Sequence, residues 1–212
     1  MRRRPWPLLL ALTAALAVAL AVAIALAGPS GGGSSATPPA SEATNSSGFD
    51  GAVLSPSPAA PGFALTDQHG RSVSLSDYRG QVTILTFLYS RCGANCTLIA
   101  QQIRGALDEL PKPVPVVIVS ADPAADSPAS IRRFLEEVAL SGRAEYLTGP
   151  VSRLRAVWHA YRITPASTSR AAFDRFASLW LLDAKGRERV LFEPEVLTPE
   201  SLAHDIRKLQ DG

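Results

Sequence analysis

The residues of this sequence best suited to chemistry are its two cysteines, Cys92 and Cys96, which are separated by Gly-Ala-Asn. Since the chain holds no other cysteine, these two pair with each other or with a partner. The spacing lets the two sulfurs face each other across one turn of backbone, which suits a reversible disulfide. It equally suits a soft metal ion held by two thiolates, with Cu(I) as the preferred ion. An inert stabilising disulfide is the third alternative, although so short a loop constrains little unfolded-state entropy.

Two expected elements position this cysteine pair. Residues Val82–Tyr89 (VTILTFLY) are β-branched and aromatic without polar alternation, which is typical of a buried central strand. Residues Leu98–Leu110 carry apolar side chains at helical spacing and stop before a proline. A helix N-terminus lowers the pKa of a nearby thiol through its dipole, and Arg91 adds a positive neighbour. A cysteine pair between a buried strand and a helix is typical of a thioredoxin-like fold.

The remaining elements alternate between strands and helices, which predicts an α/β fold whose mixed central sheet is flanked by helices. Turn signals at Asp67–Gly70 and Asp183–Gly186 each separate two short runs and predict two hairpins. The other expected elements are hairpin strands at Phe63–Leu65, Ser72–Leu75, Ala177–Leu182 and Arg189–Phe192, a buried strand at Val114–Ser120, a short strand at Glu145–Leu147, and helices starting at Asp126-Ser-Pro128 and spanning Val151–Tyr161 and Pro199–Leu209.

The N-terminus predicts a membrane anchor. Residues 8–27 form an uncharged, apolar run that as a helix would span about 30 Å of hydrocarbon. Three arginines in the preceding stub, residues 1–7, should stay cytoplasmic, so the chain crosses once and the rest lies outside. A cleaved secretory signal ending at Ala27 is the alternative, and it delivers the domain to the same side.

Composition separates a linker from a globular domain and excludes two classes of function. Residues 28–61 are rich in Gly, Pro and Ser, which predicts a flexible linker, and residues 62–212 form the domain.

The chain has 21 Lys and Arg against 19 Asp and Glu, a balance that argues against a nucleic-acid partner. Two cysteines are too few for a zinc site with four cysteine ligands.

Six short motifs lie between Phe63 and Leu209. They are Phe63-x-Leu-x-Asp-x-x-Gly70, Leu75-Ser-Asp-Tyr-Arg-Gly80, Phe87-Leu-Tyr-Ser-Arg-Cys92-x-x-x-Cys96, Val119-Ser-Ala-Asp-Pro-x-x-Asp-Ser-Pro128, Tyr146-Leu-Thr-Gly149 and Leu182-Asp-x-x-Gly186. In these motifs and their order the sequence resembles the Sco/SenC copper chaperones of cytochrome c oxidase assembly. The resemblance implies a thioredoxin-like fold with an N-terminal anchor, on the periplasmic side of a bacterial inner membrane. It also implies that Cys92 and Cys96 bind Cu(I) or reduce partner cysteines, with the oxidase copper-site subunit or other thiol or copper proteins as partners.

One position departs from the family pattern. The family's third copper ligand is a His eleven residues before the glycine of the late hairpin, and counting back from Gly186 gives Arg175. A guanidinium stays protonated and cannot ligate a metal, but it would favour thiolates if it points at the pair. The three histidines of the chain, His69, His159 and His204, are expected on exposed or half-buried surfaces and do not replace this ligand.

Two aspartates precede the helix that begins near Pro128. Asp122 and Asp126 could hold the loop beside the cysteine pair, which makes Asp122 a supporting residue of the site together with Arg91 and Arg175. We favour Asp126 as the cap of the following helix. Asp122 would then satisfy amides of its own loop.

Two functions remain open at this point. The first is a membrane-tethered, Sco-like assembly factor that handles Cu(I), reduces partner cysteines, or does both. The alternative is a metal-free thiol–disulfide oxidoreductase in which Cys92 attacks, Cys96 resolves and Arg175 supports the thiolate. Whether the protein is an enzyme therefore stays open. A peroxiredoxin is disfavoured, because the Pro and Thr of its P-x-x-x-T-x-x-C pattern would fall on Tyr89 and Gly93.

Overall fold

A mixed sheet of six strands forms the centre of the domain. The computed structural model describes residues 47–212, with Arg175 and Phe176 described by their backbone alone. The strand order is β1-β8-β7-β4-β5-β6, in which β4, β5 and β6 are parallel and β7 runs antiparallel to β4. The strands are β1 (Ala52–Val53), β4 (Thr83–Leu88), β5 (Val116–Ser120), β6 (Glu145–Leu147), β7 (Leu179–Leu182) and β8 (Glu188–Phe192).

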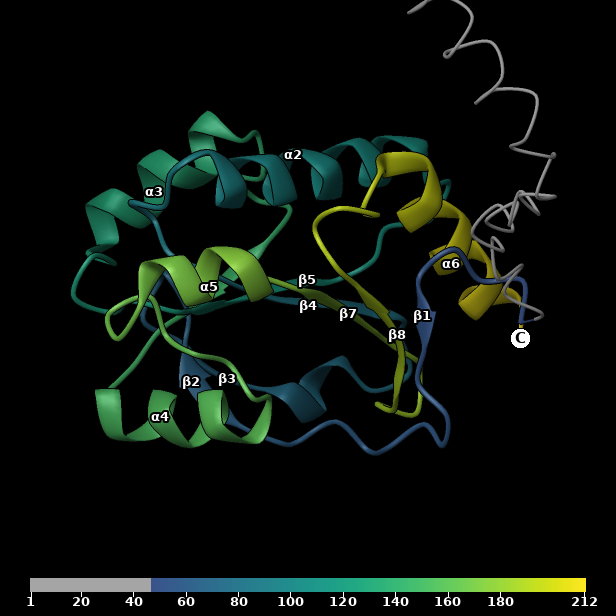
Figure 1. Ribbon diagram of the computed structural model, residues 1–212, viewed down its shortest axis with the longest axis horizontal. Coiled ribbons are helices and arrows are strands. Elements are labelled where there is room, and N and C mark those ends of the chain that lie inside the picture. Colours follow the sequence, from purple (N-terminus) through teal and green to yellow (C-terminus); the bar gives the residue numbers. More distant parts are fainter. Residues whose placement is uncertain (1–46) are drawn as a thin grey trace, which may run out of the picture. The chain divides into compact units, whose positions relative to one another are not determined.

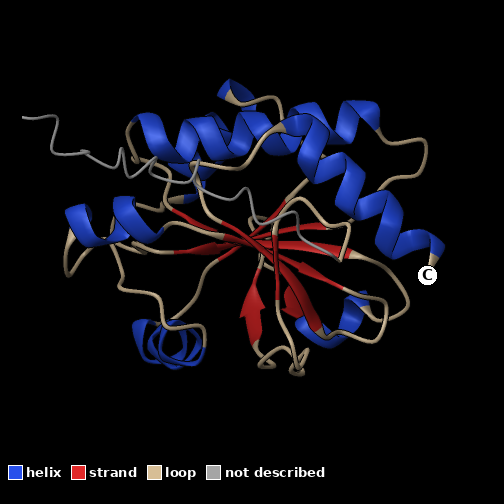
Figure 2. Cartoon of the chain, turned by 45° about the vertical axis from the view of Figure 1, so that its right-hand side comes forward, coloured by secondary structure: helices blue, strands red, loops and turns tan. Residues whose placement is uncertain are grey.

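Helices cover both faces of this sheet, which confirms the expected α/β architecture (Figures 1 and 2). Every residue of β4 and β5 is buried, because both faces of these strands are covered, and this explains why their sequences are mostly apolar. On one face lie α2 (Ala94–Glu109), α3 (Pro128–Glu137) and α6 (Pro199–Asp211), and on the other lie α4 (Val151–Ala160), the hairpin of β2 (Ala64–Thr66) and β3 (Ser72–Ser74), and the 3₁₀ helix η1 (Leu75–Tyr78).

The domain begins earlier in the chain than expected. The linker was expected to reach residue 61, but Ala52 and Val53 form β1 and pair with Leu191 and Val190 of β8. A Cβ at Gly51 would lie 2.5 Å from Val190 Cγ1, so glycine allows this close approach. A strand of two residues is too short to show periodicity in a segment rich in Gly, Pro and Ser, and composition alone therefore misplaced the boundary.

The expected anchor falls outside the described residues. The stub (1–7), the anchor or signal (8–27) and the linker up to residue 46 all precede the part of the chain that the structure describes. Within residues 47–212, no helix is both long enough and apolar enough to cross a membrane. The anchor therefore stays a prediction.

Two helices around the cysteines differ from expectation. Helix α2 begins at Ala94, four residues before the expected start, so Cys96 lies inside its first turn. A further helix, α5 (Arg170–Phe176), was not expected at all. It is capped by Ser169, whose hydroxyl accepts a hydrogen bond from the Ala172 amide at 3.2 Å. Both differences bring more of the chain to the cysteine pair than the sequence patterns indicated.

Candidate functional site

Cys92 and Cys96 form a disulfide at the junction of β4 and α2. Their Cα atoms are 5.6 Å apart, within the usual range for a disulfide. After β4 the chain makes a tight turn, in which the Cys92 amide donates a hydrogen bond to the Tyr89 carbonyl at 3.0 Å. Helix α2 then begins, and its first turn carries Cys96. The structure thus brings the two predicted site residues together as a pair.

The two halves of the disulfide differ in exposure. Cys96 is completely buried, whereas Cys92 is only partly buried, and the neighbouring Arg91 is exposed. A thiolate from another protein would therefore reach the Cys92 sulfur first. This asymmetry agrees with the expected roles, in which Cys92 exchanges with a partner and Cys96 resolves the mixed disulfide.

The N-terminus of α2 supplies positive potential at the pair. The N-cap residue is Gly93, which has no side chain to accept hydrogen bonds from the first-turn amides. The partial positive charge of these amides favours an anion, and a Cys thiolate formed on reduction is such an anion. The exposed guanidinium of Arg91 adds a full positive charge next to Cys92 in the chain. The local fold therefore suits a reducible pair.

Asp126 does not cap α3 as expected. The N-cap is Ser127, whose hydroxyl accepts a hydrogen bond from the Ser130 amide at 3.1 Å. The Asp126 carboxylate instead accepts three hydrogen bonds from other parts of the chain. They come from the Ser90 amide at 2.7 Å, the Ser120 hydroxyl at 2.5 Å and the Tyr146 hydroxyl at 2.9 Å. Asp126 thus holds the turn that leads to Cys92, which is the alternative considered second for this residue.

The pKa of Asp126 is raised by its burial, even though its hydrogen bonds favour the carboxylate. Asp122, by contrast, stabilises its own loop, because its carboxylate accepts the Ala124 amide at 3.2 Å. The described contacts of Asp122 do not include either cysteine. Its expected supporting role is therefore limited to the shape of the loop between β5 and α3.

Helix α5 brings position 175 to the cysteine loop. The Asn95 side-chain amide donates a hydrogen bond to the Asp174 carbonyl at 3.2 Å. On the same helix the Phe173 ring packs edge-on against Tyr89, with 5.4 Å between ring centroids. The Arg170 guanidinium also lies 5.9 Å from the Tyr89 ring centroid. The backbone of α5 therefore lies against the cysteine loop at Asp174, the residue before Arg175.

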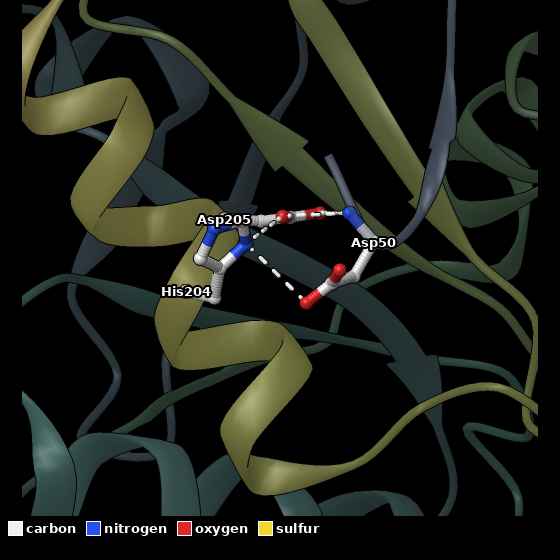
Figure 3. Close-up of side chains that lie close together, drawn as sticks. All are labelled: Asp50, His204 and Asp205. Atoms are coloured by element: carbon white, nitrogen blue, oxygen red, sulfur yellow. Dashed lines mark hydrogen bonds and ion pairs between the residues drawn. The ribbon is translucent and has the colours of Figure 1, made fainter. Parts of the chain in front are cut away.

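The chain's histidines lie on other elements. His69 is in the turn between β2 and β3, and His159 is on the exposed side of α4. His204, on α6, faces the Asp50 carboxylate at 3.3 Å and the Asp205 carboxylate at 2.9 Å (Figure 3). Among residues 47–212, this trio is the one group of three or more His, Cys, Asp or Glu ligand atoms close enough to share a metal ion.

The donor set at the cysteine pair fits Cu(I) better than Cu(II). Reduced Cys92 and Cys96 offer two soft thiolates, which Cu(I) prefers, and the described residues add no imidazole to them. The disulfide form offers no thiolate, so any metal binding requires prior reduction. Ser90, Tyr146 and Asn95 lie in the motifs quoted from the sequence, but no role was predicted for them, because their hydrogen-bond partners are distant in the chain.

Comparisons with known proteins agree with this geometry. A model of the family described as SCO1/SenC matches residues 52–211. The protein sco1 of Schizosaccharomyces pombe is 25 % identical over 153 residues, which cover 68 % of this chain and 58 % of that protein. The structure of Bradyrhizobium japonicum ScoI with copper bound is 26 % identical with a TM-score of 0.55, covering 71 % of this chain and 99 % of that one.

A shorter match is to a peroxiredoxin. The peroxiredoxin Bcp of Escherichia coli is 36 % identical over 83 residues, which cover 39 % of this chain and 51 % of that protein. The chain thus spans less than two thirds of the length of both curated relatives. The structural likeness confirms the thioredoxin-like fold with a mixed central sheet.

Proposed function

Because the chain belongs to the SCO1/SenC family, we propose that it handles Cu(I) and exchanges disulfides with partner cysteines through Cys92 and Cys96. The observation that carries this proposal is the asymmetric pair at the start of α2, with Cys92 partly exposed and Cys96 buried. A relative with a similar fold, the ScoI protein of Bradyrhizobium japonicum, has been solved with copper bound. This supports copper as the cargo.

The two thiolates would hold Cu(I) without the family's imidazole ligand. Two sulfur donors suit this soft ion, and Arg175 cannot add a third donor because a guanidinium stays protonated. A positive side chain near the pair would also repel the cation. We therefore expect weaker copper retention than in relatives with a His at this position, which suits a protein that passes its copper on.

The same pair would reduce a disulfide of a copper-site protein. The Cys92 thiolate attacks one sulfur of the partner disulfide, the partner's S–S bond breaks, and a mixed disulfide forms. The Cys96 thiolate then attacks Cys92, which releases the partner as a dithiol and leaves the Cys92–Cys96 disulfide. Two electrons pass to the partner, and its cysteines become free to receive Cu(I).

The proposed setting is the assembly of the cytochrome c oxidase copper centre. Residues 8–27 would anchor the chain once in a bacterial inner membrane, with the domain on the periplasmic side. A linker after this anchor would let the domain reach a copper-site subunit embedded in the same membrane. The family resemblance of the sequence supports this setting.

A metal-free thiol–disulfide oxidoreductase is the second candidate. An arginine at position 175, where the family has a histidine, supports it, because a guanidinium directed at the pair would favour a thiolate and disfavour a copper cation. A peroxidase is disfavoured, since Tyr89 and Gly93 replace the Pro and Thr of the peroxiredoxin pattern. The match to peroxiredoxin Bcp covers only 39 % of this chain.

Trapping a mixed disulfide tests the exchange reaction. The reduced Cys96→Ser variant is mixed with an oxidised peptide that carries two cysteines of an oxidase copper site. Cys92 should form a stable adduct, because the resolving thiol is missing. The Cys92→Ser variant is the matched control and should form little adduct, since Cys96 is buried. Equal adduct in both variants, or none in either, would contradict the proposed exchange.

A further inference from the structure

A buried carboxyl group lies directly under the turn that carries Cys92. Asp126 is 5 % exposed, and its carboxyl oxygens accept hydrogen bonds from three other segments of the chain. These partners are the Ser90 amide after β4, the Ser120 hydroxyl at the end of β5 and the Tyr146 hydroxyl on β6. The side chain therefore joins the carboxyl ends of β4 and β5 to the middle residue of β6, at the position where the cysteine loop begins.

The hydrogen bond to Ser90 fixes the geometry of the turn. The turn is closed by a hydrogen bond of 3.0 Å that the Cys92 amide donates to the Tyr89 carbonyl, and Ser90 is the first residue inside it. The Asp126 oxygen lies 2.7 Å from the Ser90 nitrogen, which is typical of a charge-assisted bond. The Ser90 hydroxyl adds a second link to the same loop by donating to the Ala125 carbonyl at 3.0 Å. These two hydrogen bonds of Ser90 attach the turn to the loop between β5 and α3.

The hydroxyl partners of Asp126 accommodate a charged or a neutral carboxyl. The Tyr146 hydroxyl lies 2.9 Å from the Asp126 oxygen and 3.1 Å from the Leu88 carbonyl. It donates to the carboxylate in one state, and in the other it accepts from the protonated carboxyl while donating to Leu88. Burial raises the pKa of Asp126, so the charge on this carboxyl is costly.

We propose that Asp126 is a positioning residue of the Cys92–Cys96 pair, which holds the turn that presents Cys92 and whose negative charge opposes reduction of the disulfide. This inference rests on the proposed function, in which the pair cycles between disulfide and thiols. Reduction creates a thiolate two residues after Ser90, whose amide binds the buried Asp126 carboxylate, and two negative charges in a medium of low dielectric disfavour each other. Asp126 therefore makes the pair a better reductant of partner disulfides.

The test compares two isosteric substitutions in the full-length chain. Asp126→Asn removes the charge, while the side-chain oxygen can still accept from Ser90 and both hydroxyls can reorient toward the new amide. Asp205→Asn is the matched control. Asp205 is also completely buried and accepts backbone amides, from Asp50 at 2.9 Å and Gly51 at 2.9 Å, but it lies on α6.

The readout is the equilibrium with glutathione at about pH 8. In this reaction the disulfide and two glutathione thiols give two protein thiols and one oxidised glutathione. We expect Asp126→Asn to shift the equilibrium constant about tenfold toward the thiols, which equals about 30 mV for two electrons. Asp205→Asn should stay within about twofold of the wild type, a free-energy change below about 0.5 kcal/mol.

Two results would overturn the inference. One is an equilibrium constant with glutathione that is the same for Asp126→Asn as for the Asp205→Asn control. The other is a shift of this constant toward the disulfide in Asp126→Asn. If the variant does not fold, amide hydrogen exchange of the wild type decides: the Ser90 amide must be protected in both redox states, and free exchange in either contradicts the positioning role. A wild-type disulfide that an excess of dithiothreitol, a stronger reductant than glutathione, cannot reduce would contradict the proposed function instead, so the two failures are distinct.

Discussion

The Asn95 side-chain amide donates a hydrogen bond to the Asp174 backbone carbonyl at 3.2 Å, and this contact joins the cysteine loop to α5. The two residues are 79 positions apart in the sequence. Position 175, which was singled out in the sequence by counting back from Gly186, therefore follows directly after the residue that contacts the cysteine loop.

Restoring a histidine at position 175 should strengthen copper binding. Arg175→His adds an imidazole donor and removes a positive charge, so we expect Cu(I) affinity to rise about tenfold, or about 1.4 kcal/mol. A coloured Cu(II) form should also become detectable, since Cu(II) accepts imidazole nitrogen. The control is Arg170→His, which makes the same change on the first turn of the same helix. Equal affinities of both variants for Cu(I), in competition with a chelator, would contradict the assigned position.

The two thiols should differ in reactivity after reduction. Cys92 is partly exposed and Cys96 is completely buried, so alkylation by iodoacetamide should be at least about tenfold faster at Cys92. The rates are measured by mass spectrometry in the single variants Cys96→Ser and Cys92→Ser, each of which leaves one thiol. Faster reaction at Cys96 would reverse the assigned roles.

Much of the fold follows from local sequence patterns, because burial and turn chemistry act over short distances. The run Val82–Tyr89 predicted the central strand β4, since a strand covered on both faces is rich in apolar and β-branched residues. The turn signals at Asp67 and Asp183 predicted both hairpins correctly. The cysteine pair was also found from the sequence alone, and the structure closes it as a disulfide.

The errors arose where distant partners decide the outcome. Asp126 and Ser127 are both of residue types that cap helices. The local pattern could not show that the hydroxyls of Ser120 and Tyr146 would donate hydrogen bonds to the Asp126 carboxylate. The short helix α5 was missed because its packing against Tyr89 is a long-range contact. The N-terminal boundary was placed too late because β1 is stabilised by pairing with β8 rather than by its own sequence.

Acid should remove a stabilising contribution of Asp67. Burial by itself raises the pKa of this carboxyl, but amides of Arg71 and His69 and the Arg71 guanidinium outweigh it, so the pKa is lowered. A lowered pKa contributes stability that is fully present above the ordinary Asp value of about 3.9 and is lost as the pH falls through the folded value.

Asp67→Asn should therefore lower the free energy of unfolding by about 1–3 kcal/mol at neutral pH and by less at about pH 3. Urea denaturation at both pH values measures this difference. Asp77→Asn is a control on a more exposed carboxylate, which accepts one hydrogen bond from the Ser74 amide. A loss for Asp67→Asn that is equal at both pH values would contradict the assigned cause.

Asp205 should hold the N-terminal segment against α6. Its buried carboxylate accepts hydrogen bonds from the Asp50 and Gly51 amides just before β1 (Figure 3). Asp205→Ala leaves these amides without their acceptor, so we expect a loss of about 1–3 kcal/mol in the free energy of unfolding. Proteolysis near residues 47–53 should become faster. His204→Ala, which removes an exposed partner, should change both much less, and equal effects of the two substitutions would contradict this assignment.

The central claim is that Cys92 and Cys96 alone suffice to hold Cu(I). The most direct test is to reduce the full-length chain, load it anaerobically with Cu(I), and titrate it against a competing chelator with metal analysis and thiol counting. The account predicts one copper per chain, bound by two protected thiols and lost in both Cys92→Ser and Cys96→Ser. No retained copper, together with a disulfide that forms and is reduced reversibly, would contradict it and identify a metal-free thiol–disulfide oxidoreductase.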